Sequence, residues 1–323
     1  MFAAEGCPED PAGVILPGSN SNPDRPRPDP TMEPDPTRRP RALVTGASSG
    51  LGREIVRQLV LNRGMDVLAT ARRVDRLDAL ASELPAGRFA FLPGDLADPA
   101  FRDRLWIWAV EAPGGIDVLV NNAGAGHFGA LAVEDFEQAR RMVELNLIAL
   151  IDLTRKAIRH MQPRGSGQIV QISSILGAFG LPYSAVYSAT KHGVDGLVKS
   201  LRYELRGTGV RVWAARPGRT ESEFFESAAG GQVAPGGMVR GRSTARVARA
   251  IVRGLDGQGA FLAPTLDAWA TLAASRWMPR AFDAFMARWS PGYFRAELER
   301  ARGRPAGEGE GDDLSGPGRP SLP

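Results

Sequence analysis

The stretch that decides the fold is Ala42-Leu43-Val44-Thr45-Gly46-Ala47-Ser48-Ser49-Gly50-Leu51-Gly52. Its apolar beginning, 42–45, predicts a buried strand, and residues 53–63 have the apolar spacing of a helix. The glycines between them permit a tight turn and close approach of the backbone to a pyrophosphate, which a helix N-terminus attracts. Their spacing is not GxGxxG, so taken alone the stretch is either a phosphate-binding turn or merely a tight one.

Short apolar runs and helical patterns alternate after this turn. The runs lie at 67–70, 89–92, 116–120, 168–173 and 210–215. This alternation predicts an α/β fold, a Rossmann-like doubly wound parallel sheet with helices on both faces. In such sheets ligands bind beyond the carboxyl ends of the strands, where the strand order reverses.

Composition divides the chain of 323 residues into four segments. Residues 1–40 are rich in Pro, Asp, Asn and Arg, and residues 302–323 are rich in Gly, Pro and acids, so both tails are expected to be disordered. Residues 41–264 are expected to form the Rossmann-like domain, and 265–301 an amphipathic helical extension.

Several classes of protein are disfavoured. The beginning is acidic (Glu5, Glu9, Asp10) and no apolar run could span a bilayer, so we expect a cytoplasmic protein. The single cysteine, Cys7, excludes an internal disulfide, and the three histidines lack metal-ligand spacing. The net charge of +4 comes from scattered arginines, which does not favour nucleic-acid binding.

Tyr187 and Lys191 are four residues apart and therefore share one face of a predicted helix. An ammonium beside a phenol favours the phenolate and is expected to lower the pKa of Tyr187 toward the working range of an acid or base.

With these residues the chain resembles the short-chain dehydrogenase/reductase family. Thr45 to Gly52 matches TGxxxGxG, Asn121-Asn122-Ala123-Gly124 matches NNAG, Asp95 matches the acidic residue that meets adenine, and Tyr187 to Lys191 matches YxxxK. The resemblance runs from Arg41 to about Phe225 and implies an NAD(P)-dependent oxidoreductase. The cofactor-binding residues that it implies are Gly46, Ser48, Ser49, Gly50, Leu51, Gly52, Asp95, Leu96, Asn122, Ala123, Gly124, Tyr187, Lys191, Pro217, Gly218 and Thr220.

The end of the second strand indicates NADP rather than NAD. It reads Ala69-Thr70-Ala71-Arg72-Arg73, without the acid that would accept ribose hydroxyls, and Asp66 lies at the other end of the strand. Arg72, with Ser49 as a second donor, is expected to bind the 2′-phosphate. The alternative is two solvated arginines at the start of a helix.

The resemblance also implies a catalytic tetrad of Asn146, Ser174, Tyr187 and Lys191. Tyr187 would be the general acid or base, Lys191 would lower its pKa and hold the ribose, Ser174 would bind the substrate oxygen, and Asn146 would hold a water. The neighbouring Ser173 is disfavoured because the family's serine stands thirteen positions before its tyrosine. Tyr183 suits substrate contact or packing, and His192 a structural role.

The substrate end is less defined. Pro217-Gly218 resembles the family's turn against the nicotinamide, although Arg219 departs from the family pattern, and the glycine-rich stretch 219–242 suits a lid. Further on, one helical face carries Leu266, Trp269, Ala270, Ala273 and Trp277, and the next carries Phe282, Phe285, Met286 and Trp289. We expect these faces to be buried against the domain or a subunit; a membrane surface or a substrate channel is the alternative.

The leading hypothesis is hydride transfer between NADP(H) and the carbonyl or alcohol of an apolar small molecule. A cofactor-binding sensor or interaction protein that does not use its site and an epimerase on the same scaffold are the alternatives. Family relatives commonly pair through long helices, here those ending at Arg159 and Arg206, so a homo-oligomer is expected.

Overall fold

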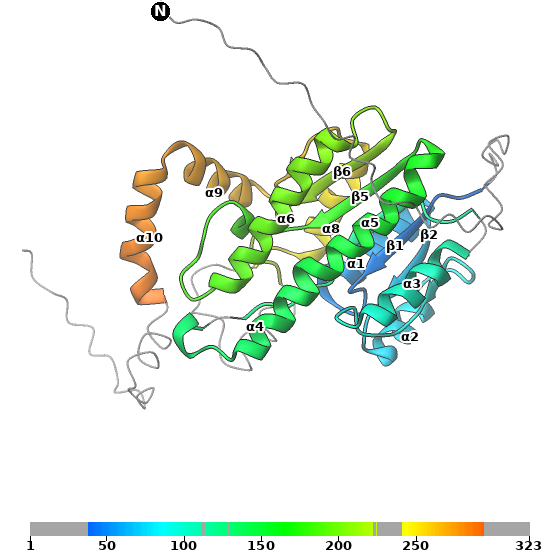
Figure 1. Ribbon diagram of the computed structural model, residues 1–323, viewed down its shortest axis with the longest axis horizontal. Coiled ribbons are helices and arrows are strands. Elements are labelled where there is room, and N and C mark those ends of the chain that lie inside the picture. Colours follow the sequence, from blue (N-terminus) through cyan, green and yellow to red (C-terminus); the bar gives the residue numbers. More distant parts are fainter. Residues whose placement is uncertain (1–37, 112–113, 128, 222–223, 225–240, 294–323) are drawn as a thin grey trace, which may run out of the picture. The chain divides into compact units, whose positions relative to one another are not determined.

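The computed structural model describes residues 38–111, 114–127, 129–221, 224 and 241–293, and it confirms the predicted Rossmann-like α/β fold (Figure 1). The described residues form a seven-stranded sheet in the order β3-β2-β1-β4-β5-β6-β7, and every neighbouring pair is parallel. The strands are β1 (Arg41–Thr45), β2 (Asp66–Thr70), β3 (Phe89–Phe91), β4 (Val118–Asn121), β5 (Gly167–Ile172), β6 (Val210–Ala215) and β7 (Phe261–Leu262).

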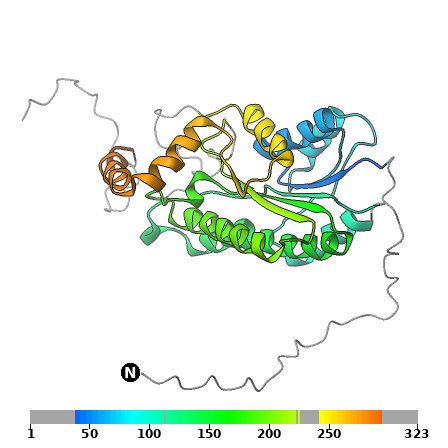
Figure 2. The ribbon, with the colours of Figure 1, turned by 90° about the horizontal axis from the view of Figure 1, so that it is seen from above.

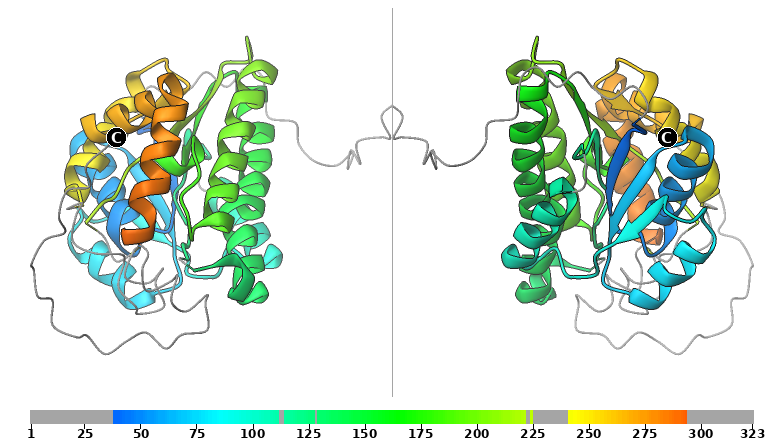
Figure 3. Two further views of the ribbon diagram at one scale, coloured as in Figure 1. Left: turned by 90° about the vertical axis from the view of Figure 1, so that its left-hand side faces the viewer. Right: turned by 90° about the vertical axis from the view of Figure 1, so that its right-hand side faces the viewer.

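Helices cover both faces of this sheet (Figures 2 and 3). On one face lie α1 (Gly50–Arg63), α2 (Val74–Ser82) and α8 (Thr244–Arg253), and on the other α3 (Pro99–Glu111), α5 (Ala149–Met161) and α6 (Ala185–Glu204). The other long helices are α4 (Phe136–Val143), α9 (Leu266–Trp277) and α10 (Pro279–Tyr293). Short helical turns are η1 (Leu131–Val133), η2 (Glu144–Ile148), η3 (Gln162–Arg164), η4 (Ile175–Gly177) and η5 (Gly254–Asp256).

Alternating side chains of the buried strands build two separate hydrophobic layers. Ala42 and Val44 of β1 pack with Ile55 of α1 on one face, whereas Leu43 packs with Leu153 of α5 on the other. A strand buried on both faces reads as a continuous apolar run, which is the pattern that 42–45 has. The central strands of the sheet are therefore covered on both faces.

The strand order reverses at β1, which lies between β2 and β4. The chain segments that follow the carboxyl ends of β1, β4, β5 and β6 therefore meet at one edge, where parallel sheets bind ligands. Every motif of the sequence lies there. In the described part of the chain, no helix is both long enough and apolar enough to cross a membrane.

The predicted boundaries differ from the structure in small ways. Helix α1 begins at Gly50 rather than at residue 53, because the last glycines of the turn already belong to its first turn. The two-residue edge strand β7 was not predicted, since so short a run has no readable period. The predicted tails and most of the predicted lid, 219–242, lie outside the described residues.

Candidate active site

The turn after β1 has the backbone conformation that only glycine adopts without strain. Gly46 and Gly50 have φ angles of 68° and 53°. At Gly52, a Cβ atom would stand 2.2 Å from the carbonyl oxygen of Gly46 and 2.3 Å from Nδ2 of Asn122. The three glycines therefore bring the turn, the start of α1 and the segment after β4 into close contact.

Hydrogen bonds tie this turn to the segment after β4. Nδ2 of Asn122 donates to the carbonyl oxygens of Thr45 (3.0 Å) and Gly46 (3.1 Å). In return, Oγ1 of Thr45 accepts from the backbone N–H groups of Asn122 and Ala123, both at 3.0 Å. The two sequence motifs thus form one bonded unit, in which the side chains fix the backbone rather than face the cavity.

The N-terminus of α1 is open to an anion. Ser49 precedes the helix without a side-chain capping bond, and the first turn has no acidic residue. The backbone N–H groups there have no partner within the helix, and the helix dipole favours negative charge. The turn, its glycines and this helix end fit the pyrophosphate of a dinucleotide.

The structure shows an arginine that the sequence analysis did not select. Nη2 of Arg73 donates to Oγ of Ser49 at 2.6 Å, and Oγ of Ser48 lies 3.4 Å from Arg73. Arg72 also lines the cavity, and both arginines are exposed. The run Arg72-Arg73 signalled a cation here, but which guanidinium reaches the serines depends on the backbone at the start of α2, where Arg73 is the N-cap residue.

Asp95 lies beyond β3 on the same side of the cavity as Leu96. Its Oδ1 accepts the backbone N–H of Ala97 at 3.0 Å, and Oδ2 lies 3.5 Å from Nη2 of Arg141. The carboxylate is therefore held by its own turn, with its remaining acceptor capacity toward the cavity.

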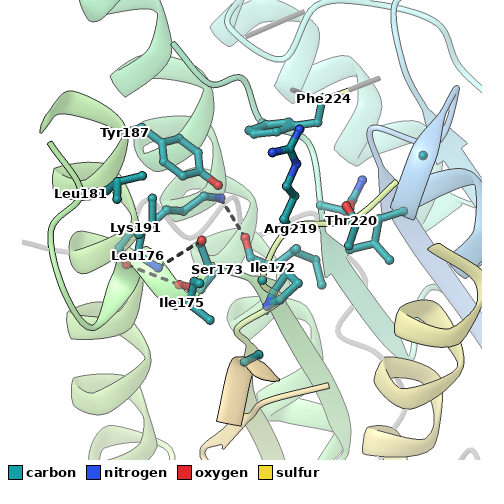
Figure 4. Close-up of a pocket in the computed structure, with 18 of the residues that line it drawn as sticks. Ile172, Ser173, Ile175, Leu176, Leu181, Tyr187, Lys191, Arg219, Thr220 and Phe224 are labelled. Carbon is teal, nitrogen blue, oxygen red and sulfur yellow. Dashed lines mark hydrogen bonds between the residues drawn. The ribbon is translucent and has the colours of Figure 1, made fainter. Parts of the chain in front are cut away.

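Tyr187 and Lys191 lie on one face of α6, and both are buried. Nζ of Lys191 is 5.6 Å from the centre of the Tyr187 ring and donates to the carbonyl oxygen of Ile172 at 2.9 Å. Figure 4 shows the phenol oxygen directed toward this ammonium. The spacing of four residues thus produces the predicted juxtaposition.

Burial dominates the titration of both groups. It raises the pKa of Tyr187 to about 12, against a smaller lowering by the hydrogen bond with Ser174. It lowers the pKa of Lys191 to about 8, with the carboxylate of Asp195 acting in the opposite direction. The predicted lowering of the phenol pKa is therefore wrong for this structure, because desolvation disfavours the phenolate.

Ser173 and Ser174 take different directions at the end of β5. Ser173 also lines the cavity, but its Oγ donates to Oδ1 of Asp195 at 2.7 Å. Ser174 is hydrogen-bonded to Tyr187, and its Oγ accepts the backbone N–H of Leu176 at 3.2 Å. The structure therefore brings Ser174, and not Ser173, to the phenol.

A buried ion pair that sequence reasoning missed lies under Lys191. Oδ2 of Asp195 is 2.7 Å from Nη2 of Arg216, and the guanidinium stacks 3.6 Å from the centre of the Phe261 ring. Asp195 is one turn beyond Lys191 on α6, and Arg216 directly precedes Pro217. This pair links α6 to the turn after β6.

Asn146 is fully buried in η2, a π-helical turn between α4 and α5. Its Nδ2 donates to the carbonyl oxygen of Ala125 and its Oδ1 accepts from the N–H of the same residue, both at 2.8 Å. Asn146 does not line the cavity, but a Cβ at Gly124 would meet both its Oδ1 (3.2 Å) and Nζ of Lys191 (3.8 Å). Its side chain fixes the loop after β4 beside the lysine.

The two other side chains considered in the sequence, those of Tyr183 and His192, do not line the cavity. Tyr183 is not among the residues that line it, and its backbone carbonyl accepts the N–H of Gly129 at 2.8 Å. Nδ1 of His192 is 2.8 Å from the carbonyl oxygen of Ser188 within α6, which is a structural contact.

One cavity of about 1100 Å³ joins these parts. All the predicted cofactor-binding residues line it, together with Ser174, Tyr187 and Lys191, and so do α9 and α10 (Figure 4 shows its centre). From the turn after β6, Pro217, Gly218, Arg219 and Thr220 line it as well. The cavity has a polar end at the glycine turn and an apolar end at α9 and α10.

The two C-terminal helices differ from prediction in one respect. The face of α10 with Phe282, Phe285, Met286 and Trp289 lines the cavity. On α9 the expected face is divided: Ala270 lines the cavity with Thr271 and Ala274, whereas Leu266 is 85%, Trp269 63% and Trp277 77% accessible. These three side chains are therefore not buried against the domain, and their burial against a subunit stays a prediction.

Comparisons with known proteins agree with this architecture. The family model described as short chain dehydrogenase matches residues 40–232. A farnesol dehydrogenase of Aedes aegypti is 35% identical over 193 residues, 57% of this chain and 78% of that protein. A putative ketoacyl reductase of Streptomyces coelicolor is 40% identical over 193 residues, which are 58% of this chain and 72% of that one.

Among solved structures, a short-chain dehydrogenase from Sphingobium yanoikuyae in complex with NADPH superposes with a TM-score of 0.66 at 30% identity, covering 77% of this chain and 95% of that one. Since the family model covers more than half of the chain and the fold agrees, this protein is an enzyme of the short-chain dehydrogenase/reductase family of oxidoreductases.

Proposed function

We propose that this enzyme transfers hydride between NADP(H) and the carbonyl or alcohol group of an apolar small molecule, with Tyr187 as general acid or base. The observation that carries the proposal is the shared cavity, which the phenol of Tyr187 lines together with the glycine turn and the apolar side chains of α9 and α10.

The side chains around the phenol fit this chemistry. With a pKa of about 12, Tyr187 is protonated at neutral pH and can donate its proton to a carbonyl oxygen. Ser174 is placed to hydrogen-bond the same oxygen while negative charge develops on it. Bound NADPH would supply the hydride to the carbonyl carbon, so that a C–H and an O–H bond replace the C=O π bond and NADP⁺ is formed.

Lys191 would return the proton. Its pKa of about 8 lies close to physiological pH, so its ammonium can release a proton toward the phenolate without a large free-energy penalty. We propose that Asn146, which holds the neighbouring loop in place, completes the path to solvent through a water, as the family resemblance implies.

The preference for NADP is proposed from the two arginines after β2. Arg73, which already donates to Ser49, and Arg72 present a positively charged rim to the cavity. A 2′-phosphate would replace the serine as an acceptor and form charge-assisted hydrogen bonds. The complex of the Sphingobium relative with NADPH supports this preference.

The test is reduction of a panel of ketones and aldehydes by purified protein with NADPH and with NADH. We expect NADPH to be preferred, and the Arg73→Ala variant to reduce that preference by roughly tenfold or more, with a smaller loss in Arg72→Ala. Arg246→Ala, an exposed arginine of α8 outside the cavity, is the control. Equal use of both coenzymes by the unaltered protein would refute the preference.

We further propose a cytoplasmic homo-oligomer. Ile148 at the end of η2, Ile151 at the start of α5 and Tyr203 at the end of α6 are exposed apolar side chains on one face of the sheet. Light scattering should give at least a dimer, and Ile151→Arg should shift it toward the monomer.

A further inference from the structure

We propose that the substrate carries an extended hydrocarbon chain, and that α9 and α10 bind this chain while its carbonyl group meets Tyr187. This inference rests on the proposed function and adds the class of substrate.

The apolar chamber is long because two helices line it along their lengths. On α9 the lining residues run from Asp267 to Ala274, about 10 Å of helix, and Met278 follows just after its end; on α10 they run from Ala281 to Trp289, about 12 Å. On both helices they recur with the helical period, so each helix presents one continuous stripe to the cavity. A chamber lined for several turns suits an elongated ligand rather than a compact one.

The stripes offer almost no partner for a charged or strongly polar group. Among the described residues, the charged side chain that these helices contribute is Asp267, and it pairs with Arg242 at 3.0 Å. The rest of the two stripes is Ala268, Ala270, Thr271, Ala274, Met278, Ala281, Phe282, Phe285, Met286 and Trp289. A carboxylate or phosphate bound there would lose its hydration without compensation, so the bound part of the substrate is a hydrocarbon.

The two helices line the cavity with side chains of different size. Helix α9 gives Ala270 and Ala274, which leave room, whereas α10 gives aromatic rings and a methionine that supply contact area. The ring of Phe282 packs edge-on against Phe179, with centroids 4.9 Å apart, and so fixes α10 to the loop after η4. We call the part of the cavity that α9 and α10 line the trough.

Phe285 lines the cavity and is nevertheless 59% exposed, so within the described part of the chain the far end of the trough reaches the surface. At the near end, Tyr187 belongs to an apolar cluster with Leu176, Phe179 and Leu181. A carbonyl group close to one end of a chain would therefore reach the phenol, while the chain extends along α9 and α10 toward solvent.

The experiment makes two comparisons. The first varies chain length, with methyl ketones from butan-2-one to dodecan-2-one. The second varies shape at equal carbon number, with the extended decan-2-one against the compact 2-adamantanone. Turnover with NADPH and calorimetric binding to the full-length chain are both measured. In the unaltered protein, kcat/KM and affinity should rise with length, by roughly 100-fold or more from butan-2-one to dodecan-2-one, because each buried methylene adds to binding. Decan-2-one should be preferred over 2-adamantanone.

Two variants narrow the trough and one does not. Ala274→Trp and Ala281→Trp should each reduce the ratio of dodecan-2-one to butan-2-one by roughly tenfold or more. Ala287→Trp, on an exposed part of α10 that does not line the cavity, should leave the ratio within about twofold.

The outcomes separate the two proposals. Turnover that does not depend on length, or a preference for 2-adamantanone, overturns the hydrocarbon chain while the reductase stands. Length-dependent binding that Ala274→Trp abolishes, without turnover of any ketone, supports the chain site and overturns the proposed reaction. Equal effects of Ala274→Trp and Ala287→Trp would place the chain elsewhere.

Discussion

The two ends of the cavity are built in different ways. At the glycine turn the binding groups are backbone atoms, fixed by side-chain bonds such as those from Asn122 to Thr45 and Gly46. At α9 and α10 the lining consists of side chains, and the helices carry few bonds to the sheet domain besides packing such as Phe179 on Phe282. A backbone site requires particular residues at fixed spacing, whereas a side-chain site tolerates many apolar sequences. The glycine turn is therefore the more constrained of the two ends, and the lining at α9 and α10 the more tolerant of apolar substitution.

The largest expected effect is at Tyr187, where the two ends meet. Tyr187→Phe removes the proton donor and keeps the ring, so turnover should fall by roughly 10²- to 10⁴-fold. Binding of NADPH and of ketones should change little, because neither end loses its lining. Stopped-flow oxidation of NADPH and calorimetric titration measure the two quantities; turnover near that of the unaltered protein would remove Tyr187 from the mechanism.

The buried ion pair between Asp195 and Arg216 is expected to contribute to the free energy of unfolding. Asp195→Asn leaves the guanidinium of Arg216 without its carboxylate, which should lower the free energy of unfolding by roughly 3 kcal/mol or more. It should also lower the pKa of Lys191, since Asp195 raises it.

Asp256→Asn is the matched control, because that carboxylate pairs with Arg63 at an exposed site and should cost at most about 1 kcal/mol. Denaturant titration measures both variants, and equal losses would contradict a special role for the buried pair.

Lys191 makes stability depend on pH. Its pKa is about 8 in the folded protein and 10.5 ordinarily, so between these values the unfolded chain binds more protons. Stability should therefore rise with pH in this window, by roughly 2 kcal/mol between pH 7 and 10. The Lys191→Met variant should lack this rise, and subtracting its curve removes the titration of other groups, including Tyr187. Parallel curves for the two proteins would contradict the lowered pKa.

A substitution in the glycine turn should affect NADPH binding and leave ketone binding at α9 and α10 in place. Gly52→Ala places a methyl group against Gly46 and Asn122, which should destabilise the fold by roughly 1–3 kcal/mol and weaken NADPH binding. Binding of a long ketone at α9 and α10 should persist.

Gly196→Ala, on an exposed part of α6 with no atom near the added methyl group, should instead stabilise by roughly 0.5–1 kcal/mol. Thermal unfolding and NADPH titration compare the stability and the cofactor affinity of the Gly52→Ala and Gly196→Ala variants. If Gly52→Ala bound NADPH normally, the turn would not be the cofactor site.

The same contrast explains what the sequence could predict. Glycines with positive φ angles and the strand-helix alternation leave a readable pattern, so the fold and the lining of the cofactor end follow from short motifs. The choice between Arg72 and Arg73 does not, because adjacent exposed side chains differ only by the local backbone.

Contacts between residues far apart in the chain are harder still to predict from the sequence. No spacing rule connects Asp195 on α6 with Arg216 after β6, which meet only through the packing of the helix on the sheet. On α9 both faces are apolar, so periodicity cannot decide that the alanines face the cavity and Trp269 and Trp277 face outward. The direction of the Tyr187 pKa shift depends on burial, which the spacing of four residues does not reveal.

We propose that one cavity holds a dinucleotide at its glycine end and a hydrocarbon at its helical end, with Tyr187 between them. A crystal structure with NADP⁺ and dodecan-2-one tests it most directly. We predict the ketone oxygen within hydrogen-bond distance of Oη of Tyr187 and Oγ of Ser174, and the chain between α9 and α10. A nicotinamide ring or a ketone bound away from Tyr187 would contradict the account.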